Sequence, residues 1–114
     1  MGDCLFCGII SGDIKGDIVY QDSSVVAFRD INPKAPVHLL IVPRKHLSTL
    51  LDVGEEDKEL IGDLMAVCTK LAKDQGISED GFRVVVNCGA GAGQSVFHIH
   101  FHLLGGRPLT WPPG

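Results

Sequence analysis

Alternation of apolar residues with histidine near the carboxyl end constrains the fold of this chain more than any other feature of its sequence. Between Val96 and Leu104 every second residue is apolar, and the residues between them include three histidines. Successive side chains of a β-strand point to opposite faces, so this pattern predicts a strand with one core face and one face of imidazoles about 6 to 7 Å apart. The apolar face consists of Phe97, Ile99, Phe101 and Leu103, and the other face of His98, His100 and His102.

The rest of the chain contains four more predicted strands and one long helix. Residues 18–21, 25–29, 37–42 and 82–87 are rich in β-branched and aromatic residues, and Pro43 ends the third run. A helix is predicted from near Glu55, because its first turn is acidic, its last turn carries lysines and Gly76 can adopt the left-handed cap. Short connections on either side of this helix predict an α+β fold with an antiparallel sheet. The apolar residues that recur three and four positions apart are Leu60, Ile61, Leu64, Met65, Cys68, Leu71 and Ala72.

Composition and charge narrow the function classes. The chain has 114 residues, 45% hydrophobic and 21% charged, and we expect one globular domain over residues 1–114, small enough to gain stability from a dimer partner. Its formal charge of −4, with no basic run longer than Arg44-Lys45, argues against a nucleic-acid partner. No apolar run is long enough to cross a bilayer and no secretion signal is recognised, so we expect a cytoplasmic protein without a membrane partner.

The face of three histidines allows three interpretations: a solvated polar face of the sheet, a metal-binding face to which His98 belongs, or a catalytic face. The glycine-rich residues 88–93, followed by Gln94 and Ser95, favour the last, because glycine backbone and side-chain donors can surround a phosphate. The same loop is compatible with an ordinary hairpin connection, and it matches neither the Walker nor the dinucleotide-binding pattern. The rest of the sequence is therefore needed to choose among the three interpretations of the histidine face.

Several ordered segments resemble the Hint branch of the histidine triad (HIT) superfamily, and together they are far more specific than a bare His-x-His-x-His. They are FRDINP at 28–33, APVH at 35–38, IVPRKH at 41–46, the long helix, GQSVFHIHFHLLGGR at 93–107 and WPPG at 111–114. The resemblance implies an α+β fold with a five-stranded antiparallel sheet, one long helix and one short helix. It also implies a two-fold homodimer across which the sheet continues.

The chemistry that this resemblance implies is hydrolysis of purine nucleoside 5′-phosphoramidates of the adenosine 5′-monophosphoramidase type. His100 would attack the α-phosphorus and form a nucleotidyl-histidine intermediate that water resolves. His102 would bind the phosphate, Ser95 would lie near the leaving group and His38 would assist proton movement. Two alternatives stay open: a dinucleoside polyphosphate hydrolase of the Fhit type and a non-catalytic nucleotide-binding module.

The resemblance also implies a nucleotide pocket. Asp30 would accept hydrogen bonds from the ribose hydroxyls, and the apolar residues would enclose the purine. Without the resemblance, the sequence indicates only that the apolar residues belong to the core, that Asn87 is a turn residue and that His38 is a core histidine. Trp111 would border the pocket of a dimer partner, the alternative being a mobile tail. The implied nucleotide-binding residues are Leu5, Phe6, Ile9, Phe28, Asp30, Ile31, Asn87, Gly93, Gln94, Ser95, His100, His102 and Trp111.

The cysteines pose a separate question. Cys4 and Cys7 have the two-residue spacing that allows both thiolates to reach one zinc ion, although the spacing also suits a reduced or oxidised redox pair. Similarity to microbial members of the superfamily implies His46 and His98 as the other ligands of a structural zinc, with no cofactor for catalysis. The remaining two cysteines, which lie in apolar segments and are interpreted as small core residues, are Cys68 and Cys88.

Overall fold

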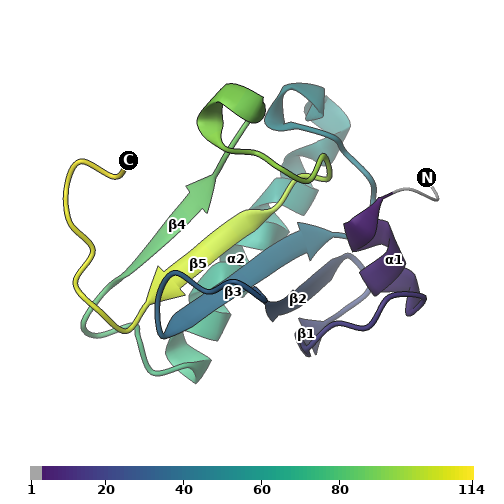
Figure 1. Ribbon diagram of the computed structural model, residues 1–114. Helices are drawn as coiled ribbons and strands as arrows, with labels where there is room; N and C mark the ends of the chain where they lie inside the picture. Colours follow the sequence, from purple (N-terminus) through teal and green to yellow (C-terminus); the bar gives the residue numbers. More distant parts are fainter. Residues whose placement is uncertain (1–3) are drawn as a thin grey trace.

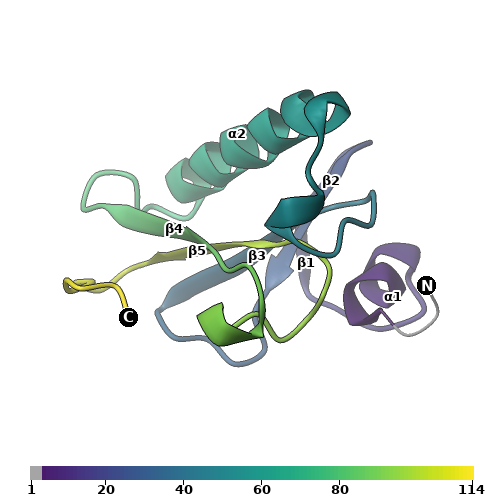
Figure 2. The same cartoon turned by 90° about the horizontal axis from the view of Figure 1, so that it is seen from above.

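A computed structural model describes residues 4–114 as a five-stranded antiparallel sheet with a helix against each face (Figures 1 and 2). The strand order is β1-β2-β3-β5-β4. β3 and β5 are therefore paired inside the sheet, although they are far apart in the sequence. The fold is the α+β arrangement with one long and one short helix that the sequence predicts. The elements are α1 Leu5–Ser11, β1 Ile18–Gln21, β2 Val25–Arg29, β3 Val37–Pro43, α2 Lys58–Asp74, β4 Phe82–Val86 and β5 Phe101–Gly105, with short 3-10 turns at Leu50–Asp52, Glu55–Asp57 and Ala90–Ala92.

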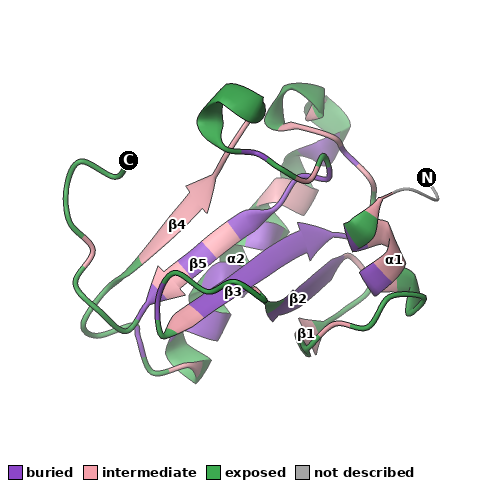
Figure 3. Cartoon of the chain, viewed as in Figure 1, coloured by how far each residue is buried: buried purple, intermediate pink, exposed green. Residues whose placement is uncertain are grey.

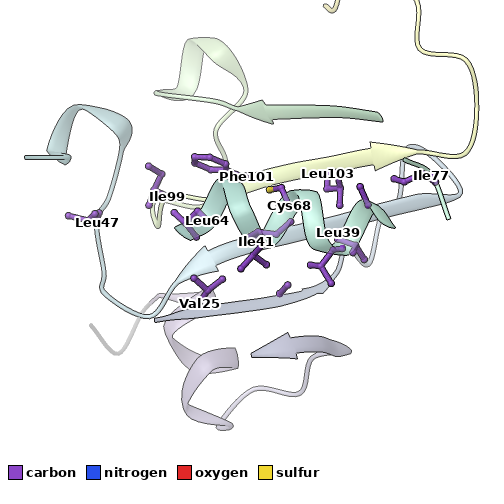
Figure 4. Packing of buried hydrophobic residues seen from close by; sticks show 14 residues of the cluster. Val25, Leu39, Ile41, Leu47, Leu64, Cys68, Ile77, Ile99, Phe101 and Leu103 are labelled. Carbon is purple, nitrogen blue, oxygen red and sulfur yellow. The ribbon is translucent and has the colours of Figure 1, made fainter. Parts of the chain in front are cut away.

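The two faces of the sheet have separate apolar cores, because strand residues alternate between them. Leu39 and Ile41 of β3 face α2, whereas Leu40 and Val42 belong to a smaller cluster with Phe6 of α1. Figure 4 shows the larger core, with side chains from α2 inserted against β2, β3 and β5. Figure 3 shows the central strands buried and the outer strands β1 and β4 only partly covered. The smaller core leaves room for a site on the face opposite α2.

The long helix begins at Lys58 and not near Glu55 as predicted, because Glu55–Asp57 form a 3-10 turn before it, and its periodicity needs one correction. Met65 was expected in the apolar stripe and is exposed instead, because it lies about 100° around the helix from the buried Leu64. Val67 occupies the buried position on the other side of the stripe. Gly76 takes a positive φ of 75°, as predicted for the residue that ends the helix.

The predicted strand from Val96 to Leu104 is wrong over its first half. β5 begins at Phe101, since β3 pairs with it only as far as Ile41, which lies opposite Phe101, and β4 ends opposite the same residue. Residues 96–100 therefore have no strand beside them and run as an irregular segment, and Phe97 is 47% exposed instead of buried. The three histidines consequently do not form one row.

Smaller differences lie at other strand ends. β3 extends to Pro43, which pairs with Val25 as the last residue of the strand, where the missing N–H of proline is tolerated. Cys68 is buried in the core as predicted, whereas Cys88 is only half-buried. Among the described residues, no helix has both the length and the apolar character needed to cross a membrane.

Candidate active site and metal cluster

A cavity of about 600 Å³ opens on the face of the sheet opposite α2. Its volume lies in the range of small-molecule sites in proteins. The polar groups of its wall converge from β3, β5 and the segments that precede β5 and follow β4. The predicted site residues that line it are Leu5, Phe6, Ile9, Phe28, Asp30, Ile31, His38, Asn87, Ser95, His100 and His102.

His100 presents an unprotonated nitrogen to this cavity. Its ring is 7% exposed, and Nδ1 lies 2.8 Å from the backbone carbonyl oxygen of His98. A carbonyl oxygen can only accept, so Nδ1 carries the proton and Nε2 keeps its lone pair. Burial lowers the pKa of His100, which favours the neutral ring. A neutral imidazole with a directed lone pair is the form that can attack an electrophilic phosphorus.

His102 is oriented through a chain of hydrogen bonds that begins in the β2–β3 loop. The backbone N–H of Lys34 donates to Nδ1 of His38 at 3.0 Å, which places the proton of His38 on Nε2. This Nε2–H lies 2.9 Å from Nδ1 of His102 and 3.4 Å from a carboxylate oxygen of Asp30. Donation to His102 leaves the proton of that ring on Nε2, as a donor. Burial, with smaller contributions from His100 and His38, lowers the pKa of His102 to about 4.

Arg107 fixes the loop that orients His38, and the sequence did not point to it. Its guanidinium group donates to the carbonyl oxygen of Lys34 from Nε at 3.0 Å and from a terminal nitrogen at 2.8 Å. The two residues are far apart in the chain, so no local pattern links them. Leu40 and Val85 also line the cavity and were not predicted as site residues. They lie there because both are paired with His102 in the sheet, and strand register cannot be deduced from the sequence of either strand.

The glycine-rich loop uses most of its expected phosphate donors to maintain its own shape. The backbone N–H of Gly93 donates to Ala90 and that of Gln94 donates to Gly89. The buried Gln94 side chain accepts from the N–H of Gly89 at 2.8 Å and donates to the carbonyl oxygen of Ser48 at 2.8 Å. Phosphate binding by Gly93 and Gln94 would require these bonds to be exchanged. Asn87 and Ser95, which flank the loop, reach the cavity directly.

Ile31 and Trp111 are the most exposed of the predicted nucleotide-binding side chains for which a large apolar surface is accessible. Ile31 is 98% exposed at the cavity rim. Trp111 is 81% exposed and does not line the cavity of its own chain. It lies in the carboxyl-terminal segment beyond β5, which runs beside β4 at the end of the sheet away from α1 (Figures 1 and 2). A role for Trp111 in nucleotide binding therefore requires a second chain.

A second constellation lies beside α1, where the four predicted metal ligands meet. One ligand atom from each of these residues lies within 4.8 Å of the others. The Nδ1 atoms of His46 and His98 are 3.1 Å apart. The distances to sulfur are 3.4 Å from His98 to Cys4 and 3.3 Å from His46 to Cys7. Separations of about 3.4 to 3.8 Å are expected between the ligands of a tetrahedral zinc ion, so the four atoms are close to a metal-binding arrangement.

The tautomers of the two histidines are compatible with a cation at this position. Nε2 of His98 lies 2.8 Å from the carbonyl oxygen of Pro43 and must donate to it, so Nδ1 is a lone pair. Nε2 of His46 lies 3.4 Å from the hydroxyl of Ser48, which can either donate or accept, so His46 can also present Nδ1 as a lone pair. In that tautomer a metal ion satisfies both Nδ1 lone pairs. The cluster can hold a metal ion, and its predicted members are all present.

The fold and the cavity define an α+β domain for small ligands with buried, neutral histidines in its wall. Residues 11–109 match the family described as the HIT domain, and the chain belongs to this family. It is 49% identical over 112 residues to an uncharacterized HIT-like protein of Synechocystis, over 98% of this chain and 97% of the other. It is also 49% identical over 107 residues to the purine nucleoside phosphoramidase of Escherichia coli, over 94% and 90% of the two chains.

Solved structures agree with this assignment. The crystal structure of a HIT family hydrolase from Legionella pneumophila matches with a TM-score of 0.97 at 52% identity, over 98% of this chain and 100% of the other. A histidine triad protein from Clostridium difficile matches with a TM-score of 0.93 at 43% identity, over 96% of each chain. The resemblance to the histidine triad superfamily and the fold that it implied are confirmed.

We predict that His102 stays neutral well below the usual titration range of histidine. Its imidazole signals in an NMR titration should move with a midpoint near pH 4, against about 6.5 in the unfolded chain. Between these values the unfolded chain binds more protons, so the contribution of His102 to the free energy of unfolding falls as the pH decreases from about 6.5 to about 4. A midpoint at or above 6.5 would contradict this environment for His102.

Proposed function

We propose that the protein is a hydrolase that cleaves purine nucleoside 5′-phosphoramidates through a covalent nucleotidyl-His100 intermediate. The observation that carries the proposal is the lone pair on Nε2 of His100, oriented into the cavity by the bond from Nδ1 to the carbonyl of His98. Two relatives support it by their names, a HIT family hydrolase and a purine nucleoside phosphoramidase. Both match nearly the full length of this chain.

The reaction divides into two substitutions at phosphorus. Nε2 of His100 forms a bond to the α-phosphorus while the bond from phosphorus to nitrogen breaks, and the departing amine takes up a proton. Water then attacks the phosphorus, the bond to His100 breaks and a nucleoside monophosphate leaves. The Nε2–H of His102 donates to a non-bridging oxygen, Ser95 lies near the leaving group, and His38 assists proton movement. Each donor that strengthens in the transition state contributes about 3 kcal/mol by analogy with oxyanion holes.

The nucleoside half of the substrate fits the other end of the cavity. Phe6 and Phe28, whose rings lie 5.3 Å apart in an edge-on arrangement, form an apolar wall for a purine together with Leu5 and Ile9. Asp30, which lines the cavity, would accept hydrogen bonds from the ribose hydroxyls. One of its carboxylate oxygens already accepts the N–H of Asn32, which holds the carboxylate in position. Ile31 at the rim and Asn87 near the phosphate complete the predicted set.

Offering an adenosine 5′-phosphoramidate and a diadenosine polyphosphate to the same preparation tests the proposed reaction. We expect faster turnover of the phosphoramidate, and a loss of at least about a thousandfold in kcat for the His100→Ala variant. AMP binding to this variant, measured by calorimetry, should persist, because the apolar wall and Asp30 remain. Faster cleavage of the polyphosphate would contradict the substrate assignment. Turnover that survives in His100→Ala would contradict the nucleophile.

We also propose that Cys4, Cys7, His46 and His98 bind a structural zinc ion and that catalysis needs no cofactor. Four protein ligands leave no open coordination position for a substrate. The ion would instead supply stabilisation, by joining α1 to the segments before α2 and before β5. The histidines of the cavity would therefore carry out the reaction without the metal ion.

Metal analysis of the purified protein under reducing conditions tests this site. We expect one zinc per chain, loss of that zinc in Cys7→Ser, and a melting temperature lower by at least about 4 °C, since a bound ligand stabilises the folded state. Cys88→Ser is the matched control, because Cys88 is a free thiol outside the cluster. Zinc content near zero in the unsubstituted protein would contradict the site.

We further propose that residues 1–114 form one HIT domain, that two chains associate in the cytoplasm as a two-fold dimer, and that the sheet continues across it. β4 is an outer strand and can pair with another chain. The carboxyl-terminal segment runs beside it, since Arg83 of β4 donates to the carbonyl oxygen of Thr110 at 3.0 Å. In the proposed dimer the exposed Trp111 would reach the partner's cavity.

Sedimentation and kinetics together test the dimer. We expect the mass of two chains at assay concentrations. Trp111→Ala should raise KM more than it lowers kcat, because the indole would border the bound nucleotide and take no part in the chemistry. The mass of a single chain, or an unchanged KM, would contradict this role.

A further inference from the structure

His98 connects the metal cluster to the candidate active site. Its side chain is fully buried, with Nδ1 in the cluster and Nε2–H donating to Pro43. Its backbone carbonyl accepts the Nδ1–H of His100 at 2.8 Å. The ring of His98 therefore anchors the same peptide unit whose oxygen selects the tautomer of the nucleophile.

Helix α1 makes a second connection between the two sites. Cys4 caps this helix by accepting the N–H of Cys7 at 3.3 Å, and both sulfurs belong to the cluster. Phe6 lies between them in the sequence and is 4% exposed. Its ring meets that of His100 edge-on, with centroids 5.0 Å apart and an interplanar angle of 89°. The turn that carries the thiols thus also carries a wall of the nucleophile's pocket.

Helix α1 is held by the smaller core and by the side chains at its first turn. It has only seven residues, and an isolated helix of this length is not stable in water. Its buried residues are Phe6 and Ile9, which pack on the smaller of the two cores. Figure 2 shows α1 at the side of the sheet away from α2, so the large core does not support it. The cysteines of the same turn therefore give Phe6 a second anchor besides its packing in the smaller core.

We propose that the Cys4, Cys7, His46 and His98 cluster positions the active site, so that metal binding and nucleotide binding strengthen each other. This rests on the proposed nucleotide-binding function and on the proposed zinc. Phe6 and His98 act as positioning residues: with the cluster closed, Phe6 stays against His100 and the carbonyl of His98 stays aligned with Nδ1. A purine held against Phe6 in turn keeps α1, and hence the two thiols, in the metal-binding arrangement. Thermodynamic linkage requires that the nucleotide change the zinc affinity by the same factor as zinc changes the nucleotide affinity.

Equilibrium competition measures the coupling without using catalysis. Zinc-loaded protein is mixed with an indicator chelator of known zinc affinity, with and without saturating AMP, and the indicator is calibrated in the same AMP concentration. We expect AMP to raise the zinc affinity of the protein by at least about fivefold. Inorganic phosphate at the same concentration should have no such effect, because it lacks a base to contact α1. Calorimetry should show AMP binding weakened by the same factor in stripped protein.

Phe6→Leu is the variant that separates coupling from stability. Leucine keeps an apolar side chain in the core but removes the ring contact with His100, so zinc affinity without AMP should stay the same while the AMP effect shrinks. Equal zinc affinity with and without bound AMP would overturn the coupling and leave the proposed hydrolase intact. A loaded protein that binds no AMP would overturn the nucleotide site itself. A protein that takes up no zinc would overturn the coupling together with the metal site.

Discussion

The hydrogen bond from Nδ1 of His100 to the carbonyl oxygen of His98 is the interaction on which the site depends. It forms because residues 96–100, which precede β5, lie outside the sheet. The carbonyl oxygen of His98 therefore has no partner in a neighbouring strand. In a regular strand this carbonyl would point sideways toward a neighbouring strand. The irregular segment instead turns it toward the next histidine, and the lone pair on Nε2 is directed into the cavity. The irregular segment before β5 thus sets the tautomer of the proposed nucleophile.

Burial determines how the other histidines behave. His38 and His102 lie where desolvation lowers their pKa values, so both remain neutral. The backbone N–H of Lys34 in the β2–β3 loop sets the proton position of His38, which in turn sets that of His102, and Arg107 holds Lys34 from beyond β5. The result is a donor at Nε2 of His102 beside an acceptor at Nε2 of His100. Similar rings have opposite roles because each Nδ1 has a different partner.

Much of this arrangement was predictable from the sequence, and the failures have identifiable causes. Strand and helix patterns depend on local alternation, so β1, β2 and the long helix were predicted closely. The strand across residues 96–100 failed because alternation cannot tell whether a neighbouring strand is present. The predicted burial of Met65 was wrong because this residue lies at the edge of the apolar stripe of the helix, where a small rotation of the helix decides whether a side chain is buried or exposed. Arg107, Leu40 and Val85 depend on pairings between distant segments, which a single sequence does not reveal.

The covalent intermediate is the central claim, and rapid-quench mass spectrometry tests it most directly. Protein mixed with an adenosine phosphoramidate, quenched in alkali within the first turnover and digested should yield the peptide of His100 carrying one adenylyl group. His100→Ala treated in the same way should yield no such peptide. Sustained turnover without an adduct, or an adduct on another residue, would contradict the assignment of His100 as the nucleophile.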